Sequence, residues 1–106
     1  MISRTWHGIV PLTMKDWFEA YEYETGVKDA LATEGNCGAY LKVVEHGDYA
    51  HFFLCTKWWS MESMIAFAGN DPRRAVDYPE DEKYRLISDP IVVIQEVTDV
   101  GNPFED

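Results

Sequence analysis

Two side chains in this sequence, His7 and Tyr78, have the chemistry of a proton-transfer site. An imidazole titrates near neutrality, so His7 can take a proton from a phenol or an enol. The phenol of Tyr78 can donate a hydrogen bond to the oxyanion that this transfer creates. The alternative for each is structural: His7 is then a core histidine bonded to a neighbour, and Tyr78 packs in a loop.

Aromatic side chains are the candidate walls of a substrate pocket. They make up 14% of the chain, which indicates an aromatic-lined cavity or a large interface. The candidates are Trp6, Trp17, Trp58 and Phe67, and Thr5 joins them because it shares the strand face of His7. Packing in the core or in a dimer seam is the alternative for each tryptophan.

Other polar groups give weaker signals. Arg73 and Arg74 are expected at the surface, and the acidic run at residues 80–82 is expected to be solvated. Cys37 and Cys55 lack the spacing of a zinc site, and no glycine-rich phosphate loop occurs. We therefore expect no metal and no cofactor.

The first half of the chain predicts a strand, a helix and a hairpin. Residues 2–10 alternate as a strand, and Thr13 with Asp16 has the pattern of a capping box. Gly26 is expected to break the helix that follows, with a last turn near residues 29–31. Its predicted buried stripe is Met14, Trp17, Phe18 and Tyr21, and its predicted solvated residues are Lys15, Asp16, Glu19 and Glu22. Strands at 37–45 and 49–58 are separated by a short gap with Gly47, which predicts a hairpin.

The second half predicts a helix, a helical loop and a last strand. Ser60 has the character of an N-cap, and Gly69-Asn70 that of a C-terminal stop. Asp71-Pro72 is expected to start another helical turn. A helical or irregular piece should run over residues 78–86, and the last strand over residues 91–97. The predicted stripe of the central helix is Met61, Met64, Ile65 and Ala68, with Phe67 at its edge.

This β-α-β-β-α-β order predicts an α+β fold, a ferredoxin-like antiparallel sheet with helices on one face. Residues 1–98 form the single predicted domain, and residues 99–106 a polar tail. The strands at 50–56 and 91–94 are apolar on both faces, so the face without helices needs a cover. A second copy of the chain is the simplest cover, which predicts a homodimer.

Composition excludes several classes of partner. The chain has 106 residues and a formal net charge of -10, so it repels nucleic acids and anionic membranes. No apolar run approaches the ~20 residues of a membrane span. The first residues lack the apolar core of a signal peptide, and the cytoplasm is the expected compartment.

Several motifs together resemble the antibiotic-biosynthesis-monooxygenase family. They are Trp6-His7-Gly8, Glu24-Thr25-Gly26, Gly35-Asn36-Cys37-Gly38, and the stretch from Trp58 to Asp81 with Phe67-Ala68-Gly69, Asp71-Pro72 and Tyr78-Pro79-Glu80-Asp81. The resemblance implies a dimeric α/β barrel. Haem-degrading relatives use Asn, Trp and His. Here Thr5 or His7 falls at the Asn, Phe67 near the Trp, and Asp77 or Tyr78 at the His, which argues against haem degradation.

The resemblance implies a cofactor-independent monooxygenase acting on a small aromatic or polyketide-like substrate. In that hypothesis His7 is the base and Tyr78 positions the oxyanion. Two other functions stay open on the same residues: a non-catalytic homodimer that binds a small hydrophobic ligand, and an isomerase or lyase. Convergence of His7 and Tyr78 in a cavity would favour the enzymes, whereas a space filled by side chains would favour the non-catalytic dimer.

Overall fold

A computed structural model describes residues 1–98 of the chain, and the predicted tail at residues 99–106 lies outside the described residues. The strands and α-helices, in chain order, are β1 (Ile2–Pro11), α1 (Lys15–Glu22), α2 (Lys28–Ala32), β2 (Asn36–His46), β3 (Tyr49–Trp58), α3 (Met61–Ala68), β4 (Ile87–Ser88) and β5 (Val93–Glu96). Short 3-10 turns span Leu12–Met14 and Asp81–Tyr84, and a π-helical turn spans Tyr23–Val27.

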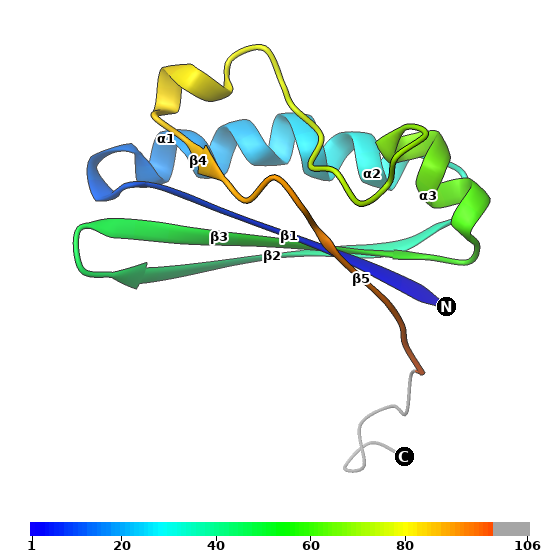
Figure 1. Cartoon of the computed structure of the whole chain (residues 1–106). Coiled ribbons are helices and arrows are strands. Elements are labelled where there is room, and N and C mark those ends of the chain that lie inside the picture. Colours follow the sequence, from blue (N-terminus) through cyan, green and yellow to red (C-terminus); the bar gives the residue numbers. More distant parts are fainter. Residues whose placement is uncertain (99–106) are drawn as a thin grey trace.

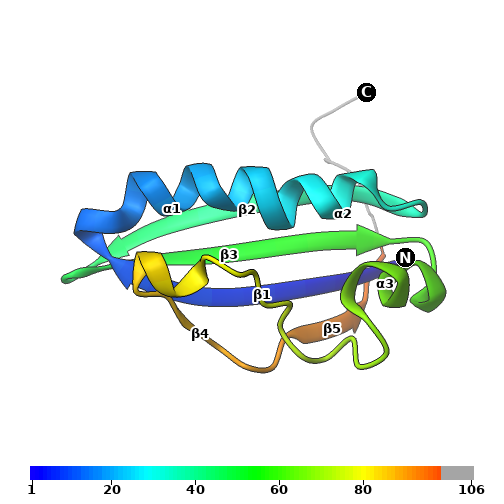
Figure 2. The ribbon, with the colours of Figure 1, turned by 90° about the horizontal axis from the view of Figure 1, so that it is seen from above.

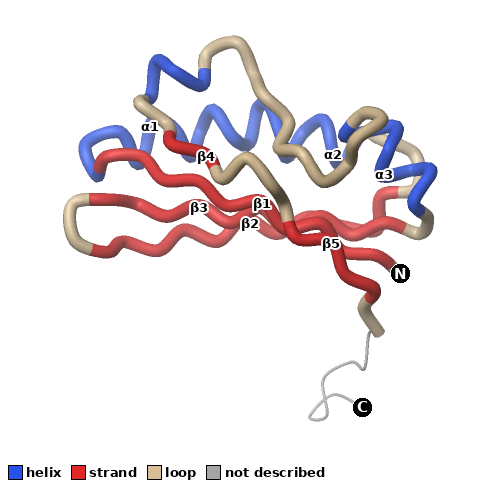
Figure 3. Tube along the Cα trace, in the orientation of Figure 1, coloured by secondary structure: helices blue, strands red, loops and turns tan. Residues whose placement is uncertain are grey.

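The strands form one antiparallel sheet in the order β2-β3-β1-β4, and β5 also pairs with β1. The helices lie on one face of this sheet, and the opposite face is not covered by any described element (Figure 1, Figure 3). Seen from above, the α1–α2 helix runs along the sheet, with the 69–86 segment beside it over β1 (Figure 2). The predicted ferredoxin-like α+β fold is therefore confirmed.

The predicted break of the first helix at Gly26 is wrong, whereas the predicted last turn near residues 29–31 does form, within α2. The helix continues from α1 through the π-helical turn into α2, and Gly26 lies buried in that turn. The hydroxyl of Thr25 donates to the carbonyl of Tyr21 at 2.8 Å, at the point where the α-helical ladder is interrupted. A π-helical turn adds one residue to the helix, and such turns occur often at functional sites.

Asp71-Pro72 starts a turn, as the sequence predicts, closed by the Arg74 amide on the Asp71 carbonyl, and the turn does not continue as a helix. Two other local predictions at element ends are wrong. Thr13 lies in a 3-10 turn and caps nothing, because the α1 N-terminus has no side-chain cap. The last strand begins at Val93, because Pro90 and the isolated bridge of Ile91 with Arg74 hold the preceding residues off the β1 ladder.

Two predicted features are confirmed in detail. The Ser60 hydroxyl accepts from the Ser63 amide at 3.2 Å and so caps α3. Gly69 follows the helix with a φ of 93°, which lies in the region that favours glycine. The β2–β3 hairpin also forms, with paired residues from Asn36↔Trp58 to His46↔Tyr49.

The core lies between the sheet and the helices. Its main cluster includes Phe18 from α1 and Phe52 from β3, whose rings meet edge to face at 4.9 Å. A smaller cluster joins Ala30, Trp58 and Met64 near α3. None of the helices in residues 1–98 has the length and apolarity that crossing a bilayer demands.

Candidate functional site

A small cavity lies between the sheet and its helical cover. Its apolar walls are Trp6, Leu54, Phe67, Val76 and Leu86, and its polar lining is Arg4, Glu22, Tyr78, Asp81 and Ser88, with Gly26 between them. Its free volume is about 20 Å³. That volume accommodates a water molecule, but not an aromatic ring.

Arg4 projects from β1 into the base of this cavity and is only 4% exposed. Its guanidinium donates to the carbonyls of Pro72 at 3.0 Å and of Arg74 at 2.7 Å. No carboxylate lies within ion-pair distance of it among residues 1–98. Burial lowers the pKa of Arg4 to about 10, so the group stays cationic at neutral pH. The cavity therefore contains a buried positive charge without a counter-ion.

Glu22 faces the cavity from the last residue of α1 and is 5% exposed, although the sequence predicts a solvated residue. Gly26 leaves room for its carboxyl, since a Cβ at that position would lie 3.2 Å from Glu22 Oε2. Burial, and secondarily the charge of Asp81, raise the pKa of Glu22 to about 7. This is the pKa expected of a general base that works at neutral pH.

Asp81 and Tyr78 close the cavity from the 69–86 segment. Asp81 Oδ2 accepts from the Tyr78 amide at 2.9 Å, whereas Asp81 Oδ1 is buried without a partner within the described chain. Burial raises the pKa of Asp81. The Tyr78 hydroxyl donates to Asp29 on α2 at 2.9 Å. Burial, and then this bond, raise the pKa of Tyr78, which remains a neutral phenol.

The structure brings only some of the predicted site residues together. Trp6, Phe67 and Tyr78 line the cavity. Trp58 lies behind that wall and stacks on Phe67 with 5.4 Å between ring centroids. Trp17, predicted to be buried, is 71% exposed on the outer side of α1 and has no place in this cavity.

His7 and Tyr78 do not converge. Alternation along β1 places Arg4 and Trp6 on the helix-covered face, and Thr5 and His7 on the open face. The strand register agrees with this assignment, since residues paired across strands share a face of the sheet. Thr5 pairs with Val93, and His7 pairs with Phe53. The predicted base and the predicted oxyanion donor therefore lie on opposite sides of the sheet.

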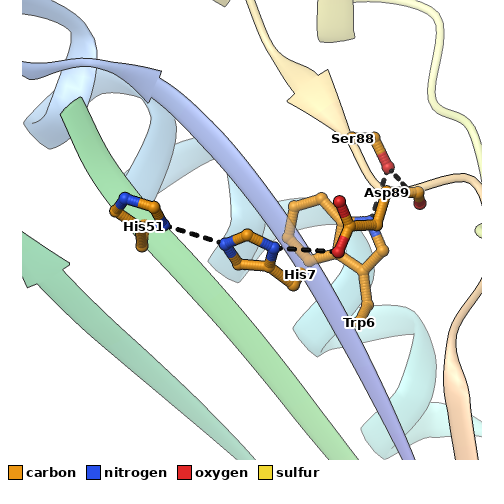
Figure 4. A network of polar contacts seen from close by, with 5 residues as sticks. All are labelled: Trp6, His7, His51, Ser88 and Asp89. Carbon is orange, nitrogen blue, oxygen red and sulfur yellow. Dashed lines mark hydrogen bonds and ion pairs between the residues drawn. The ribbon is translucent and has the colours of Figure 1, made fainter.

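On the open face His7 belongs to a hydrogen-bonded chain (Figure 4). Its Nδ1 lies 2.9 Å from Asp89 Oδ2, and its Nε2 lies 2.9 Å from Nδ1 of His51. The ring of His7 also stacks on Phe53, with 4.6 Å between centroids. Both nitrogens of His7 are therefore occupied by neighbouring side chains, and neither is free to act on a substrate.

The segment after β4 connects the two faces. Trp6 Nε1 donates to Ser88 Oγ at 2.7 Å on the cavity side, and Ser88 Oγ donates to the Asp89 carbonyl at 2.9 Å. The next side chain, Asp89, crosses to the open face and holds His7 (Figure 4). Two consecutive residues thus anchor a side chain on each side of the sheet.

Sequence reasoning missed the three ionisable groups of the cavity, Arg4, Glu22 and Asp81. Arg4 carries a usable signal, because it shares the β1 face of Trp6. Glu22 follows the buried Phe18 by four residues and precedes Gly26 by four, which is also a usable pattern. Asp81 lies in an acidic run, and nothing in that run distinguishes it from Glu80 or Glu82.

Within residues 1–98 no three His, Cys, Asp or Glu side chains are grouped closely enough to hold a metal ion.

Comparison with known proteins supports the fold. No protein-family model and no curated protein match the sequence. Among solved structures, an arginine-to-serine variant of MhuD with two manganese protoporphyrin IX groups bound per active site is 21% identical, with a TM-score of 0.61 over 96% of this chain and 100% of that one. Rv0793 from Mycobacterium tuberculosis is 14% identical, with a TM-score of 0.54 over the same shares. At such identities a likeness shows the fold. The chain accordingly has the ferredoxin-like α+β fold implied by its resemblance to the antibiotic-biosynthesis-monooxygenase family.

Proposed function

We propose that the protein is a cofactor-independent monooxygenase that deprotonates a small phenol or enol in the cavity between sheet and helices. Glu22, and not His7, is the base in this proposal. The buried carboxyl of Glu22, turned into a cavity with an unpaired Arg4 cation, is the observation that carries it. In this proposal the deprotonated, electron-rich substrate gives electrons directly to molecular oxygen. One oxygen atom replaces a C–H bond and ends as a carbonyl, and the other leaves as water, so the substrate itself supplies all the electrons. This is the chemistry that the family resemblance implies.

The charges of the cavity suit the anion that this reaction forms. Glu22, with a pKa of about 7, is half ionised at neutral pH and can accept a proton from a phenol or an enol. Arg4 supplies a fixed positive charge, and its low-dielectric surroundings strengthen its attraction to a phenolate or enolate. The indole of Trp6 and the ring of Phe67 offer flat apolar walls for an aromatic body.

Substrate entry requires the 69–80 segment to move, because the closed cavity of about 20 Å³ is too small for an aromatic ring. Polar contacts hold this segment down: the two Arg4 bonds to the carbonyls of Pro72 and Arg74, and a bond from the Glu80 amide to the Tyr21 hydroxyl. An anionic substrate that takes over the Arg4 guanidinium would release the segment at the same time.

Porphyrin chemistry does not fit this cavity. The MhuD structure holds two manganese porphyrins per active site. The cavity of this chain, at about 20 Å³, is too small for a porphyrin, and no His, Cys or Met lines it within the described chain. Those are the usual axial ligands of haem iron, together with Tyr. Tyr78 is the tyrosine present, and its hydroxyl is bonded to Asp29.

The test is a screen of phenols and enols with oxygen uptake as the readout, followed by Glu22→Gln with His7→Gln as its matched control. Glu22→Gln should lower kcat by roughly 10²–10⁴-fold. His7→Gln should leave kcat within a few-fold. The wild-type rate should rise with pH through a midpoint near 7, as Glu22 ionises. Loss of rate in His7→Gln with Glu22→Gln unaffected would return the role of base to His7.

A non-catalytic homodimer is the second candidate, and the filled space between sheet and helices favours it. In that case no compound in the screen would consume oxygen. Apolar ligands would instead bind without turnover, and Glu22→Gln would not weaken their binding. Binding that needs Glu22 without oxygen uptake would point to an isomerase or lyase, which uses the same proton transfer.

We further propose a homodimer in which the open sheet faces of two copies pack together. This face carries exposed apolar groups from two strands, Tyr40 and Val44 of β2 and Val93 of β5, besides the half-buried Phe53 of β3. Phe53→Asp would bury an unpaired carboxylate in such an interface, at a cost of several kcal/mol. Sedimentation should show a dimer for the wild type and a monomer for Phe53→Asp. A monomeric wild type at tens of micromolar would contradict the homodimer.

A further inference from the structure

The open sheet face is basic, although the whole chain has a net charge of -10. All three histidines, His7, His46 and His51, lie on it, together with Lys42 and Lys57. Strand alternation and register place no Asp or Glu of β1, β2, β3 or β5 on the same side. Asp89 is the one carboxylate that the described chain brings to this face, from the segment after β4.

The three histidines form a connected group. Asp89, His7 and His51 are joined by two contacts of 2.9 Å (Figure 4). His46 lies edge-on to His51, with 6.3 Å between ring centroids. The nitrogen–nitrogen bond between His7 and His51 needs a lone pair on one of the two atoms. With His7 donating to Asp89, the arrangement that satisfies every contact has His51 donating to His7.

We propose that a second copy of the chain covers this face, and that protonation of the His7–His51–His46 group dissociates the resulting dimer. This inference rests on the homodimer proposed above and adds its control by pH. Imidazoles change charge between pH 5 and 8, so the switch operates near physiological pH.

The groups that face the histidines decide the sign of the effect. From β2 they are Lys42 and His46, from β3 His51 and the ring of Phe53, and from the segment after β4 the Asp89 carboxylate. Lys42 and His46 lie beside His51, so protons added to the histidine group bring further positive charge to a face that already carries lysines. A dimer doubles every one of these charges and removes them from water, whereas the separated chain solvates them.

The dimensions of the face suit a second copy. Three neighbouring strands of about ten residues, flanked by β4 and β5, span a sheet of roughly 600 Å² at the usual strand spacing and rise. A standard interface buries about 800 Å² per partner. The lysines are already packed along apolar rings, with Lys42 over Phe53 and Lys57 over Tyr40, so at neutral histidine charge they do not prevent association.

The experiment measures the dimer dissociation constant of labelled full-length chain by dilution at pH 7.5, 6.5 and 5.5, with circular dichroism as a check of folding. The constant should rise at least tenfold from pH 7.5 to 5.5, since dissociation takes up protons. His51→Gln and His7→Gln should each flatten this dependence. Glu22→Gln is the matched control, because Glu22 also titrates near neutrality but lies on the other face, and it should keep the full dependence.

Each outcome separates the two proposals. A monomer at pH 7.5 overturns the homodimer and this inference with it. A dimer whose dissociation constant is unchanged or lower at pH 5.5 overturns the histidine control and leaves the homodimer standing. A pH dependence of the dissociation constant that persists in both histidine variants likewise overturns the histidine control and leaves the homodimer standing.

Discussion

The two faces of one sheet hold ionisable groups in opposite ways. On the helix-covered face Arg4, Glu22 and Asp81 are enclosed around a small cavity, and burial moves the pKa of each. On the open face His7 bonds to both His51 and Asp89, in reach of water. A proton acceptor is thus present on both faces, a buried carboxyl on one and imidazoles on the other.

Phe52 and Phe53 are adjacent residues on opposite faces, and truncating each in turn tests the comparison most strongly. Phe52→Ala should lower the free energy of unfolding by about 3–5 kcal/mol, because it empties a fully buried site beside Phe18. Phe53→Ala should cost less than about 2 kcal/mol, because its ring is only half-buried. Urea unfolding measures both.

Unfolding measured at several protein concentrations separates the two variants further. The loss in Phe53→Ala should depend on concentration, because that ring acts through the dimer, whereas the loss in Phe52→Ala should not. Equal losses that are independent of concentration would mean that the open face belongs to the core of the monomer.

Glu22→Gln should stabilise the protein in a pH-dependent way. Below pH 4.5 the carboxyl is protonated in both states and costs nothing. Between pH 4.5 and 7 the unfolded chain ionises while the folded protein does not, so the free energy of unfolding falls as pH rises. Above pH 7 the buried carboxylate lowers the free energy of unfolding by about 3 kcal/mol. Glu22→Gln should raise the free energy of unfolding by this amount at pH 8, and only slightly at pH 5.

Glu24→Gln, an exposed neighbour in the same helix, is the control for that experiment. Its difference from wild type should be small and constant over the same pH range. A carboxyl resonance of Glu22 that titrates near pH 4.5 would show that this side chain is solvated and would remove it as a base.

Ser88 and Asp89 allow the smallest test, across the connection between the faces. Ser88→Ala leaves the buried Trp6 indole N–H without a partner, and should cost about 1–3 kcal/mol in thermal or urea unfolding. Asp89→Ala removes an exposed hydrogen bond with His7, and should cost no more than about 1 kcal/mol. The reverse order would indicate that the open-face chain is the more buried of the two.

Features set by neighbouring residues were predictable from the sequence. The Gly47 turn between two strand patterns predicts the hairpin, and Ser60 before an apolar stripe predicts the start of α3. Their causes are local, because turn and cap conformations depend on a few adjacent residues. The order of elements then leads to the ferredoxin-like sheet.

The candidate site depends on contacts between distant segments, and sequence reasoning recovered only part of it. It identified Trp6, Phe67 and Tyr78, but assigned His7 to the same site although the sheet separates it from Tyr78. Residue type alone favoured an imidazole as base. The burial that gives Glu22 the matching pKa comes from the sheet, from Asp81 and from a helix that does not stop at Gly26.

The π-helical turn at Tyr23–Val27 changes the direction in which the side chains of the second half of this helix point. Each residue of an α-helix advances it by about 100°, so the extra residue rotates everything after it by that amount. The first half thereby directs Phe18 and Glu22 at the main core and the cavity, while the second half directs Ala30 at Trp58 and Met64. Deleting one residue from this turn would keep the helix but turn Ala30 toward solvent. The helix therefore accepts substitutions at the exposed residues of the turn, Tyr23 and Glu24, more readily than a change in its length.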